Sequence, residues 1–417
     1  KVIKPLFLDK LYAELERSRG SEKGLQALLE RVSTIKVFDP ACGSGNFLII
    51  GYKELRRFEI EVFRALNAVS KQNVIFMTGI KLSQFYGIEI DDFAHEIALL
   101  SLWLTEHQMN QEFEAASGHA EPMLPLKASG NIVHGNSLRL NWEDVCPPVD
   151  ARGNEYEVCI CGNPPFLGYK YRAAPQNEDM DFVFNGFSKH RFLDYVACWF
   201  WKATAYMTNK SAEVAFVSTN SICQGEQVGM LWPHIINSGV RIKFAYETFP
   251  WKNSAKGNAA VHVIIVGLTS QSVPSKIYHY DKDSLRVTEH PNVNPYLVGA
   301  SNAVVASSSK PLSGQIPMSS GSYLRDGGAL VLSEVEKREL LAECPLAQSW
   351  VRPLVGAEEM LSGKQRWCLF LENESLEALN EIPVIAKRLK EVEASRLASS
   401  KLATKLQAET PHLFSEV

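Results

Sequence analysis

The sequence predicts an α/β fold with a doubly wound, mostly parallel sheet, and three observations lead to this prediction. From Ile35 onward, short apolar runs of strand-like composition alternate with longer stretches that have helical apolar spacing. The first apolar run leads into a glycine-containing turn and then a helix, over residues 37–48. Two strand-like runs, residues 242–248 and 260–267, are joined by a polar loop that contains glycine, which indicates a final hairpin.

The expected elements follow one another in a regular order. Residues 1–34 have the apolar spacing of helices, with a break at residues 18–21. We expect strands at residues 37–38, 85–90, 132–136, 156–161, 214–218, 242–248 and 260–267. We expect helices at residues 46–58, 93–107, 188–207 and 225–236. Asp92 is placed to cap the second of these helices, and residues 168–187 are expected to form a long loop.

Beyond Gly267 the composition changes. Residues 270–275 are typical of a linker, and residues 302–322 are rich in Ser, Gly and Pro. Ser333 and Glu336 have the spacing of a capping box. The stretch from Ser375 onward is helical and basic, which indicates either a helix that contacts phosphates or a solvated helix face. We therefore expect an N-terminal helical segment (1–34), a main α/β domain (35–269), and a linker followed by a flanking helical or α+β region (270–417).

Composition narrows the class of protein without choosing a function. The hydrophobic content of 46% suits a globular chain, and the net charge of −4 argues against a generally basic nucleic-acid coat. No apolar run of about 18 residues and no signal peptide is visible, so we expect a cytoplasmic protein without a membrane span. The eight cysteines lack paired Cys-x-x-Cys motifs, which argues against zinc, and Cys159 and Cys161 should be buried thiols on one strand face. Because the chain begins at Lys1 rather than Met, we expect it to be a piece of a longer protein.

The turn at residues 39–45 is the first candidate binding element. Gly43 and Gly45 permit positive φ and a close approach of the backbone to a ligand. A ligand at this turn would meet free N–H groups and the positive end of the dipole of the following helix. The spacing differs from the dinucleotide fingerprint Gly-x-Gly-x-x-Gly, so the turn alone indicates a nucleotide only weakly.

The second candidate element is the segment Asn163, Pro164, Pro165 and Phe166, which follows the strand at residues 156–161. The residue before a proline is held extended, and proline has a carbonyl but no N–H, so the segment offers acceptors in a fixed geometry. A planar group with an amine would donate to the Asn163 oxygen and the Pro164 carbonyl while its ring stacks on Phe166. The alternative is an ordinary turn at the end of a strand.

Together, residues 39–45 and 163–166 resemble the methionine-binding and catalytic motifs of the amino-group DNA methyltransferases, which use S-adenosylmethionine. The glycine motif precedes the catalytic motif, as in the gamma-ordered adenine enzymes. The resemblance covers most of the chain, including residues 252–261, and is strongest to the MmeI-like type IIG restriction–modification enzymes. It implies a Rossmann-like S-adenosylmethionine-dependent methyltransferase sheet with an antiparallel last strand at residues 35–269, followed in 270–417 by the start of an incomplete target-recognition region.

The resemblance also implies where the cofactor binds, at the strand ends where ligands of doubly wound sheets lie. Residues 39–45 would hold its methionine end. Glu89 would accept both ribose hydroxyls, with a helix-capping acid as the alternative. Ile90 would pack against the cofactor's adenine, and Asn136 would hydrogen-bond that adenine, although many relatives have Asp there. The expected cofactor-binding residues are Asp39, Pro40, Ala41, Cys42, Gly43, Gly45, Glu89, Ile90 and Asn136.

The expected catalytic residues are Asn163, Pro164, Pro165 and Phe166. Acceptors at Asn163 and the Pro164 carbonyl would localise the lone pair of an aromatic amine and stabilise the positive charge that develops on nitrogen.

A base inside a duplex must be flipped out and held by stacking before it reaches this segment. Phe166 is expected to be one stacking plate and Phe249 the second, with Trp251 as the competitor. Ordinary core packing is the alternative for Phe249 and for Trp251. Asp194 and Tyr195 match a region that relatives use near the cofactor.

We therefore expect an adenine-specific DNA methyltransferase that uses S-adenosylmethionine, acts on double-stranded DNA and belongs to a restriction–modification protein. No Asp…Glu-x-Lys cluster is placed for metal-dependent cleavage, so the nuclease should lie elsewhere in the full-length chain, and no metal ligands are expected. One alternative is a methyltransferase for RNA bases or protein glutamine amides, since the same acceptors suit those amines. The other is a non-catalytic DNA-specificity module.

Overall fold

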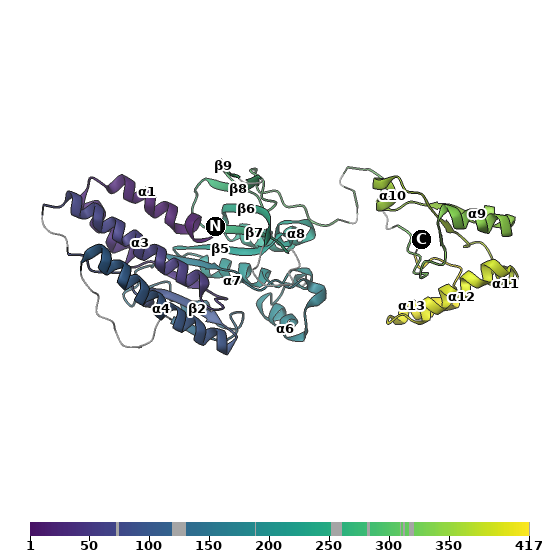
Figure 1. Cartoon of the computed structure of the whole chain (residues 1–417), viewed down its shortest axis with the longest axis horizontal. Helices are drawn as coiled ribbons and strands as arrows, with labels where there is room; N and C mark the ends of the chain where they lie inside the picture. Colours follow the sequence, from purple (N-terminus) through teal and green to yellow (C-terminus); the bar gives the residue numbers. More distant parts are fainter. Residues whose placement is uncertain are drawn as a thin grey trace. The chain divides into compact units, whose positions relative to one another are not determined.

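The computed structural model describes residues 1–71, 75–118, 131–187, 189–251, 261–281, 284–308, 310–311, 313–316 and 321–416. It divides into two compact units, residues 1–307 and 308–417, and each is described here by itself (Figure 1). Residues 252–260 lie outside the described residues. They make up most of the stretch 252–261, which the family resemblance includes.

The first unit is built on a large sheet. In the described residues this sheet has nine strands in the order β3-β2-β1-β4-β5-β7-β6-β8-β9. The strands are β1 Lys36–Asp39, β2 Phe85–Glu89, β3 Asn131–His134, β4 Val158–Gly162, β5 Ala212–Thr219, β6 Arg241–Trp251, β7 Val261–Thr269, β8 Ser275–Asp281 and β9 Ser284–His290. Strands β1 to β5 pair in parallel, and β7 pairs antiparallel with both β5 and β6. The predicted doubly wound sheet with an antiparallel last strand is therefore confirmed.

Helices cover both faces of this sheet. They are α1 Asp9–Ser18, α2 Glu22–Val32, α3 Asn46–Val69, α4 Asp92–Ser117, α5 Trp142–Val145, α6 Ala174–Val183, α7 Ala197–Met207 and α8 Gly225–Asn237. Short helical turns lie at η1 Lys4–Leu8, η2 Leu82–Gln84, η3 Tyr169–Tyr171, η4 His190–Phe192 and η5 Asn220–Cys223. Helices α1 to α4 pack on one side, with α3 along α4, whereas α5 to α8 contribute to the core on the other side (Figure 1).

Strand β4 shows how the sequence divides the two cores. Cys159 and Cys161 face the core shared with α1 to α4, while Val158 and Ile160 face the core shared with α5 to α8. Successive side chains of a strand point to opposite faces, so a strand covered on both sides must be apolar throughout. Cys159 and Cys161 are buried free thiols on one face, as predicted.

Two predicted helices differ from those observed. The cap of α4 is Asp91, whose side chain accepts a hydrogen bond from the Ala94 amide at 2.8 Å, and Asp92 is instead the first residue of the helix. The helix predicted at residues 188–207 begins only at Ala197. Just before this helix, the side chain of Asp194 accepts a hydrogen bond from the Val196 amide at 3.3 Å.

Two other predicted segments contain unexpected structure. The predicted loop 168–187 contains α6, a helix with little apolar periodicity that buries only Asp179 and Met180. The predicted linker 270–275 leads directly into β8, which pairs in parallel with β6 and then antiparallel with β9. The sheet therefore continues past the predicted final hairpin.

The second unit has a small antiparallel sheet and short helices. The strands, in the order β10-β12-β11, are β10 Val331–Leu332, β12 Arg366–Leu369 and β11 Val351–Leu354. The helices are α9 Glu334–Glu343, α10 Ala357–Ser362, α11 Leu376–Asn380, α12 Pro383–Leu397 and α13 Leu402–Leu406, with turns η6 Pro345–Ser349 and η7 Gln407–Glu409. The capping box is confirmed, since the Glu336 amide donates to Ser333 Oγ at 3.2 Å and the Ser333 amide donates to Glu336 Oε2 at 2.8 Å. Within the described ranges, no helix is long and apolar enough to cross a membrane.

Candidate functional site

A cavity of about 460 Å³ opens at the carboxyl ends of β1, β2, β3 and β4. This is the edge of a doubly wound sheet at which ligands bind. Nine of the predicted site residues line it: Pro40, Ala41, Gly43, Glu89, Ile90, Asn136, Asn163, Pro165 and Phe166. The structure thus brings the glycine turn and the Asn-Pro-Pro-Phe segment to one place.

A larger hollow of about 660 Å³ lies at the opposite, amino-terminal edge, beside the starts of β4 and β5. Its wall includes Arg31, whose guanidinium pairs with Glu157 at 2.7 Å. It contains neither motif, so its size does not make it the candidate site.

The glycine turn lies directly over β2. Gly43 and Gly45 have φ of +53° and +84°, a region that glycine adopts more readily than residues with a side chain. The Cys42 amide donates to the Ile88 carbonyl at 3.0 Å, and the Gly45 amide donates to the Cys42 carbonyl at 2.8 Å. A Cβ at Gly43 would meet no described protein atom within 4 Å, so the turn leaves open space beside its backbone.

Glu89 ends β2 and is half-buried beside this turn. Its Oε2 accepts from the Gly43 amide at 2.7 Å, and its Oε1 accepts from the Asp91 amide at 2.9 Å. A carboxylate oxygen has two acceptor positions, so each oxygen keeps one for a further donor. The neighbouring Ile90 side chain is 65% exposed and lies in the cavity wall.

Asp39 lies behind the turn and is fully buried. Its Oδ1 accepts from the Ala41 amide at 3.0 Å, while Oδ2 has no hydrogen-bond partner in the described residues. Burial raises the pKa of this carboxyl to about 8, and the nearby charge of Glu89 adds to the effect. Gly162 fits against it, since a Cβ there would lie 2.6 Å from Asp39 Oδ1.

Asn163 follows β4 with an exposed side chain that makes no hydrogen bond to any residue the structure describes. Pro164 is buried, Pro165 is exposed, and Phe166 is half-buried between the two cores. The next residue is fixed at both backbone groups, because the Leu167 amide donates to Asp194 Oδ1 and its carbonyl accepts from the Tyr195 amide, each at 3.1 Å. The acceptor-bearing segment is therefore anchored while its amide side chain stays available.

A second group of contacts lies behind the cavity wall formed by Asn136 and Tyr195. Asp179 of α6 accepts from Asn136 Nδ2 at 3.1 Å to each carboxylate oxygen, and from the Tyr195 hydroxyl at 2.7 Å. Arg139 Nε donates to the same carboxylate at 2.7 Å. Burial and the hydrogen bond to Asp179 raise the pKa of the Tyr195 hydroxyl, which keeps it protonated as a donor.

Four further predicted site residues, Cys42, Gly45, Pro164 and Phe249, do not line the cavity. Cys42 is buried in the core, and Gly45 and Pro164 contribute backbone geometry. The Phe249 ring is 8% exposed and contacts Tyr280 at 5.5 Å between ring centroids. The side chain of its predicted competitor, Trp251, lies outside the described residues.

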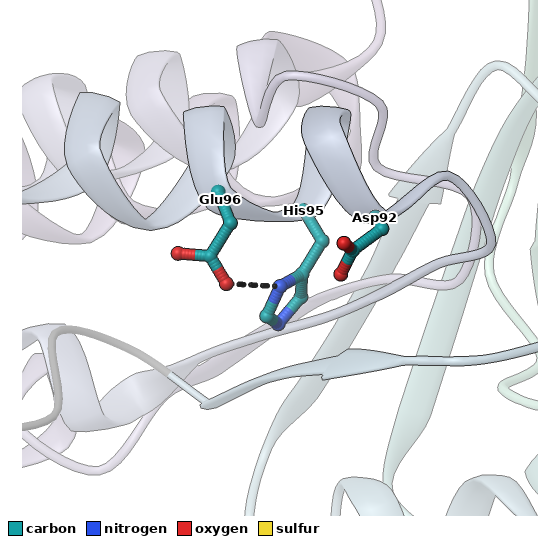
Figure 2. A group of neighbouring side chains, drawn as sticks. All are labelled: Asp92, His95 and Glu96. Carbon is teal, nitrogen blue, oxygen red and sulfur yellow. Dashed lines mark hydrogen bonds and ion pairs between the residues drawn. The ribbon is translucent and has the colours of Figure 1, made fainter.

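Outside the cavity, Asp92, His95 and Glu96 lie together at the start of α4 (Figure 2). His95 Nδ1 is 3.1 Å from Glu96 Oε1, and Nε2 is 3.3 Å from the Ile132 carbonyl oxygen. Both ring nitrogens have protein partners and both carboxylates are exposed, so a solvated helix start accounts for the group.

Comparison with known proteins identifies the family. The family model described as "MmeI, DNA-methyltransferase domain" matches residues 15–279, and "MmeI, target recognition domain" matches residues 299–417. The chain belongs to the MmeI family.

Two relatives extend this result. The chain is 40% identical over 415 residues to DNA methyltransferase A of Bacillus subtilis (strain 168), which covers 99% of this chain and 46% of that protein. It is 37% identical to the solved structure of the Type IIL restriction–modification enzyme MmeI in complex with DNA, with a TM-score of 0.84, covering 100% of this chain and 55% of that one. The chain thus spans about half the length of these relatives.

Two groups at or behind the cavity of this MmeI-family chain have no local signal in the sequence. Asp179 lies on α6, which has no periodic pattern that would mark it as a helix with a buried acid. Gln176, on the same helix, also lines the cavity. Asp194 was noted by resemblance, but its contact with the Leu167 amide joins segments distant in sequence and has no local signal.

Proposed function

We propose that this chain transfers a methyl group from S-adenosylmethionine to the exocyclic amine of an adenine in double-stranded DNA. One observation carries the proposal. The glycine turn with Glu89 and the free amide of Asn163 open into the same cavity of about 460 Å³. A methyl donor held by the first would lie next to an amine held by the second, which is the positioning that a transfer reaction needs.

The residues of the first half fit an adenosyl cofactor. The open space beside Gly43 would admit its methionine end, supported by residues 39–45. Glu89 has an acceptor position free on each oxygen for the ribose hydroxyls. Ile90 would cover one side of the nucleobase, and Asn136 would hydrogen-bond its edge. When bound, the cofactor supplies a sulfonium methyl group with a good leaving group behind it.

The residues of the second half fit an aromatic amine. Asn163 Oδ1 and the Pro164 carbonyl would accept from the two amine hydrogens and draw the nitrogen towards a tetrahedral form. The same two oxygens would stabilise the positive charge that develops on nitrogen as the bond to carbon forms. Phe166, in the cavity wall, would stack on a base flipped out of the duplex.

We propose that Phe249 stacks on the other face of the flipped base only after the site rearranges. Its ring now packs in the core near the carboxyl end of β5, opposite Val263, and would have to leave the contact with Tyr280. The flanking residues 252–260 connect directly to this strand. Base stacking by Phe249 would thus require movement of β6.

The proposal extends to the roles of residues 299–417 and of a longer parent chain. We infer that residues 299–417 read the DNA sequence and that a nuclease lies elsewhere in a longer chain, acting with this domain on cytoplasmic DNA. The match to the MmeI target recognition domain and the half-length coverage of relatives support this inference.

Transfer of a tritiated methyl group separates this proposal from its alternatives. The chain is incubated with labelled S-adenosylmethionine and, separately, duplex DNA, RNA or protein, and labelled nucleosides are then separated. Label in N6-methyladenine of DNA is expected. Label in RNA or glutamine instead would contradict the proposal, and binding of DNA without label in any acceptor would favour a specificity module.

A further inference from the structure

Asp179 sets the hydrogen-bonding character of the cavity wall without itself lining the cavity. It is 6% exposed and lies behind Asn136 and Tyr195, both of which face the cavity. Its Oδ1 pairs with Arg139 Nε at 2.7 Å. An ionised carboxylate accepts hydrogen bonds and donates none, so each neighbour must turn a proton towards it.

This requirement fixes what the two wall residues can offer to a ligand. The Tyr195 hydroxyl uses its single proton on Asp179, so its oxygen can only accept from the cavity. Asn136 directs its amino group to Asp179, and its oxygen accepts from the Leu138 amide at 2.9 Å. The amide is thereby held in one of its two orientations, with one oxygen lone pair and one N–H left over.

We propose that Asp179 is a positioning residue that presets this wall to accept an exocyclic amine, so that the cofactor site selects a 6-amino purine over a 6-oxo purine. This rests on the proposed function, because it takes the ligand to be an adenosyl cofactor. A 6-amino purine places an amine donor beside a ring-nitrogen acceptor, which matches the remaining acceptors and the remaining N–H of the wall. A 6-oxo purine reverses the pattern and brings its oxygen against the lone pairs of Tyr195. Accommodating it would turn the Asn136 amide over and break its bonds to Asp179 and Leu138.

Calorimetry with two ligands tests the inference on the chain without DNA. S-adenosylhomocysteine and S-inosylhomocysteine differ only at the purine 6-position and the adjoining ring nitrogen. The unaltered chain should prefer the adenosyl ligand by about tenfold or more, as expected for one to two hydrogen bonds. Asp179→Asn supplies a donor at this point, which lets the Tyr195 hydroxyl and the Asn136 amide reverse. Its preference should fall by about tenfold, mainly through tighter binding of the inosyl ligand relative to the adenosyl ligand.

Asp181→Asn is the matched control. It makes the same chemical change on α6, at an exposed residue that pairs with His190 and Arg191 rather than with the wall. Its preference for the adenosyl over the inosyl ligand should equal that of the unaltered chain. Tyr195→Phe is a second test that leaves Asp179 and its pairing with Arg139 in place. It should weaken the adenosyl ligand and spare the inosyl ligand, and it carries the test if Asp179→Asn shows no cooperative thermal transition.

The outcomes are distinct. An unchanged preference in folded Asp179→Asn, or in Tyr195→Phe, would overturn the role of Asp179 while leaving the proposed function intact. Failure of the unaltered chain to bind S-adenosylhomocysteine would overturn the proposed function itself. The inference is supported if Asp179→Asn and Tyr195→Phe both prefer S-adenosylhomocysteine over S-inosylhomocysteine less than the unaltered chain does, while Asp181→Asn does not differ from it.

Discussion

The side chain of Asp194 accepts a hydrogen bond from the backbone amide of Leu167, with 3.1 Å between Oδ1 and N. Its Oδ2 accepts from the Thr219 hydroxyl at 3.0 Å. One buried carboxylate thus ties the residue after Phe166 to the end of β5. The orientation of the Asn-Pro-Pro-Phe segment therefore depends on a side chain that lies outside it.

Asp194→Ala should separate positioning from cofactor binding. Loss of the tie lets residues 163–167 shift, and a displacement of about 1 Å lowers turnover by about 100-fold. Cofactor affinity should change little, because Asp194 does not line the cavity. Single-turnover DNA methylation and calorimetric cofactor binding measure the two effects. Asp144→Ala, at an exposed residue, is the control. Equal losses of affinity and turnover would contradict the positioning role.

Asn163→Ala should lower turnover by about 100-fold to 1,000-fold, the effect of removing one preorganised polar group from a transition state. The side chain is exposed and makes no hydrogen bond within the described chain, so stability should stay within about 0.5 kcal/mol. Methylation rates and thermal unfolding provide the measurements. Asn237→Ala, at the exposed end of α8, controls for loss of an amide. Undiminished turnover would remove Asn163 from the proposed chemistry.

Gly162→Ala should destabilise the fold by about 1–3 kcal/mol, because the added methyl group meets a packed neighbour. Its Cβ would lie 2.6 Å from Asp39 Oδ1, and that carboxyl is fully buried. Gly20→Ala is the matched control, since a Cβ there meets nothing within 4 Å of the described atoms. It should change stability by less than about 1 kcal/mol. Denaturant unfolding compares the two, and an equal effect in both would refute the close fit.

Asp39 should make stability fall as pH rises. Burial raises the pKa of its carboxyl from 3.8 to about 8, so the folded chain binds a proton more tightly than the unfolded chain. The associated stability is fully present below about pH 4 and is lost as pH rises through about 8. Asp39→Asn removes this dependence. From pH 4 to pH 9, the free energy of unfolding of the unaltered chain should therefore fall relative to that of the variant. A difference that is flat with pH would show that Asp39 is ionised in the folded state throughout.

Arg396 should be critical for the second unit. Its side chain is 1% exposed and donates only to carbonyl oxygens, those of Leu324, Arg325, Gln407, Thr410 and Leu413. Arg396→Met leaves these acceptors without their donor and should destabilise the unit by at least about 1–3 kcal/mol, the cost of one unsatisfied buried acceptor. Arg338→Met, at a side chain that is 77% exposed, should have little effect. Duplex DNA affinity should fall in Arg396→Met while cofactor affinity is retained, and unchanged unfolding would contradict the structural role.

The sequence predicts the central strands and both motifs because their signals are local. Strands covered on both faces, such as β4 and β5, must be continuous apolar runs, and these stand out from their flanks. The glycine turn and the Asn163 segment each consist of adjacent residues whose backbone restrictions follow from glycine and proline. Their convergence on one cavity follows from the strand order, which the alternation of elements implies.

The remaining features arise from contacts between distant segments. Asp179 gains its role only where α6, the turn after β3 and the segment before α7 meet, and α6 itself lacks an apolar stripe. Strand β9 is exposed over most of its length, so its sequence shows no alternation of buried and exposed residues. Asp91 and Asp92 are adjacent acids, and either could cap α4 by its sequence. Backbone geometry decides that Asp91 is the cap.

The insertion of β7 between β5 and β6 has a consequence for the order of synthesis. Strand β5 leaves the ribosome well before β7, the strand that pairs with its open edge. Until β7 has been made, β5 can pair with β4 on one edge only, and its other edge stays open. A chain released before β7 is complete would therefore contain residues 39–45 and 163–166 but would expose the apolar edge of β5, which favours aggregation.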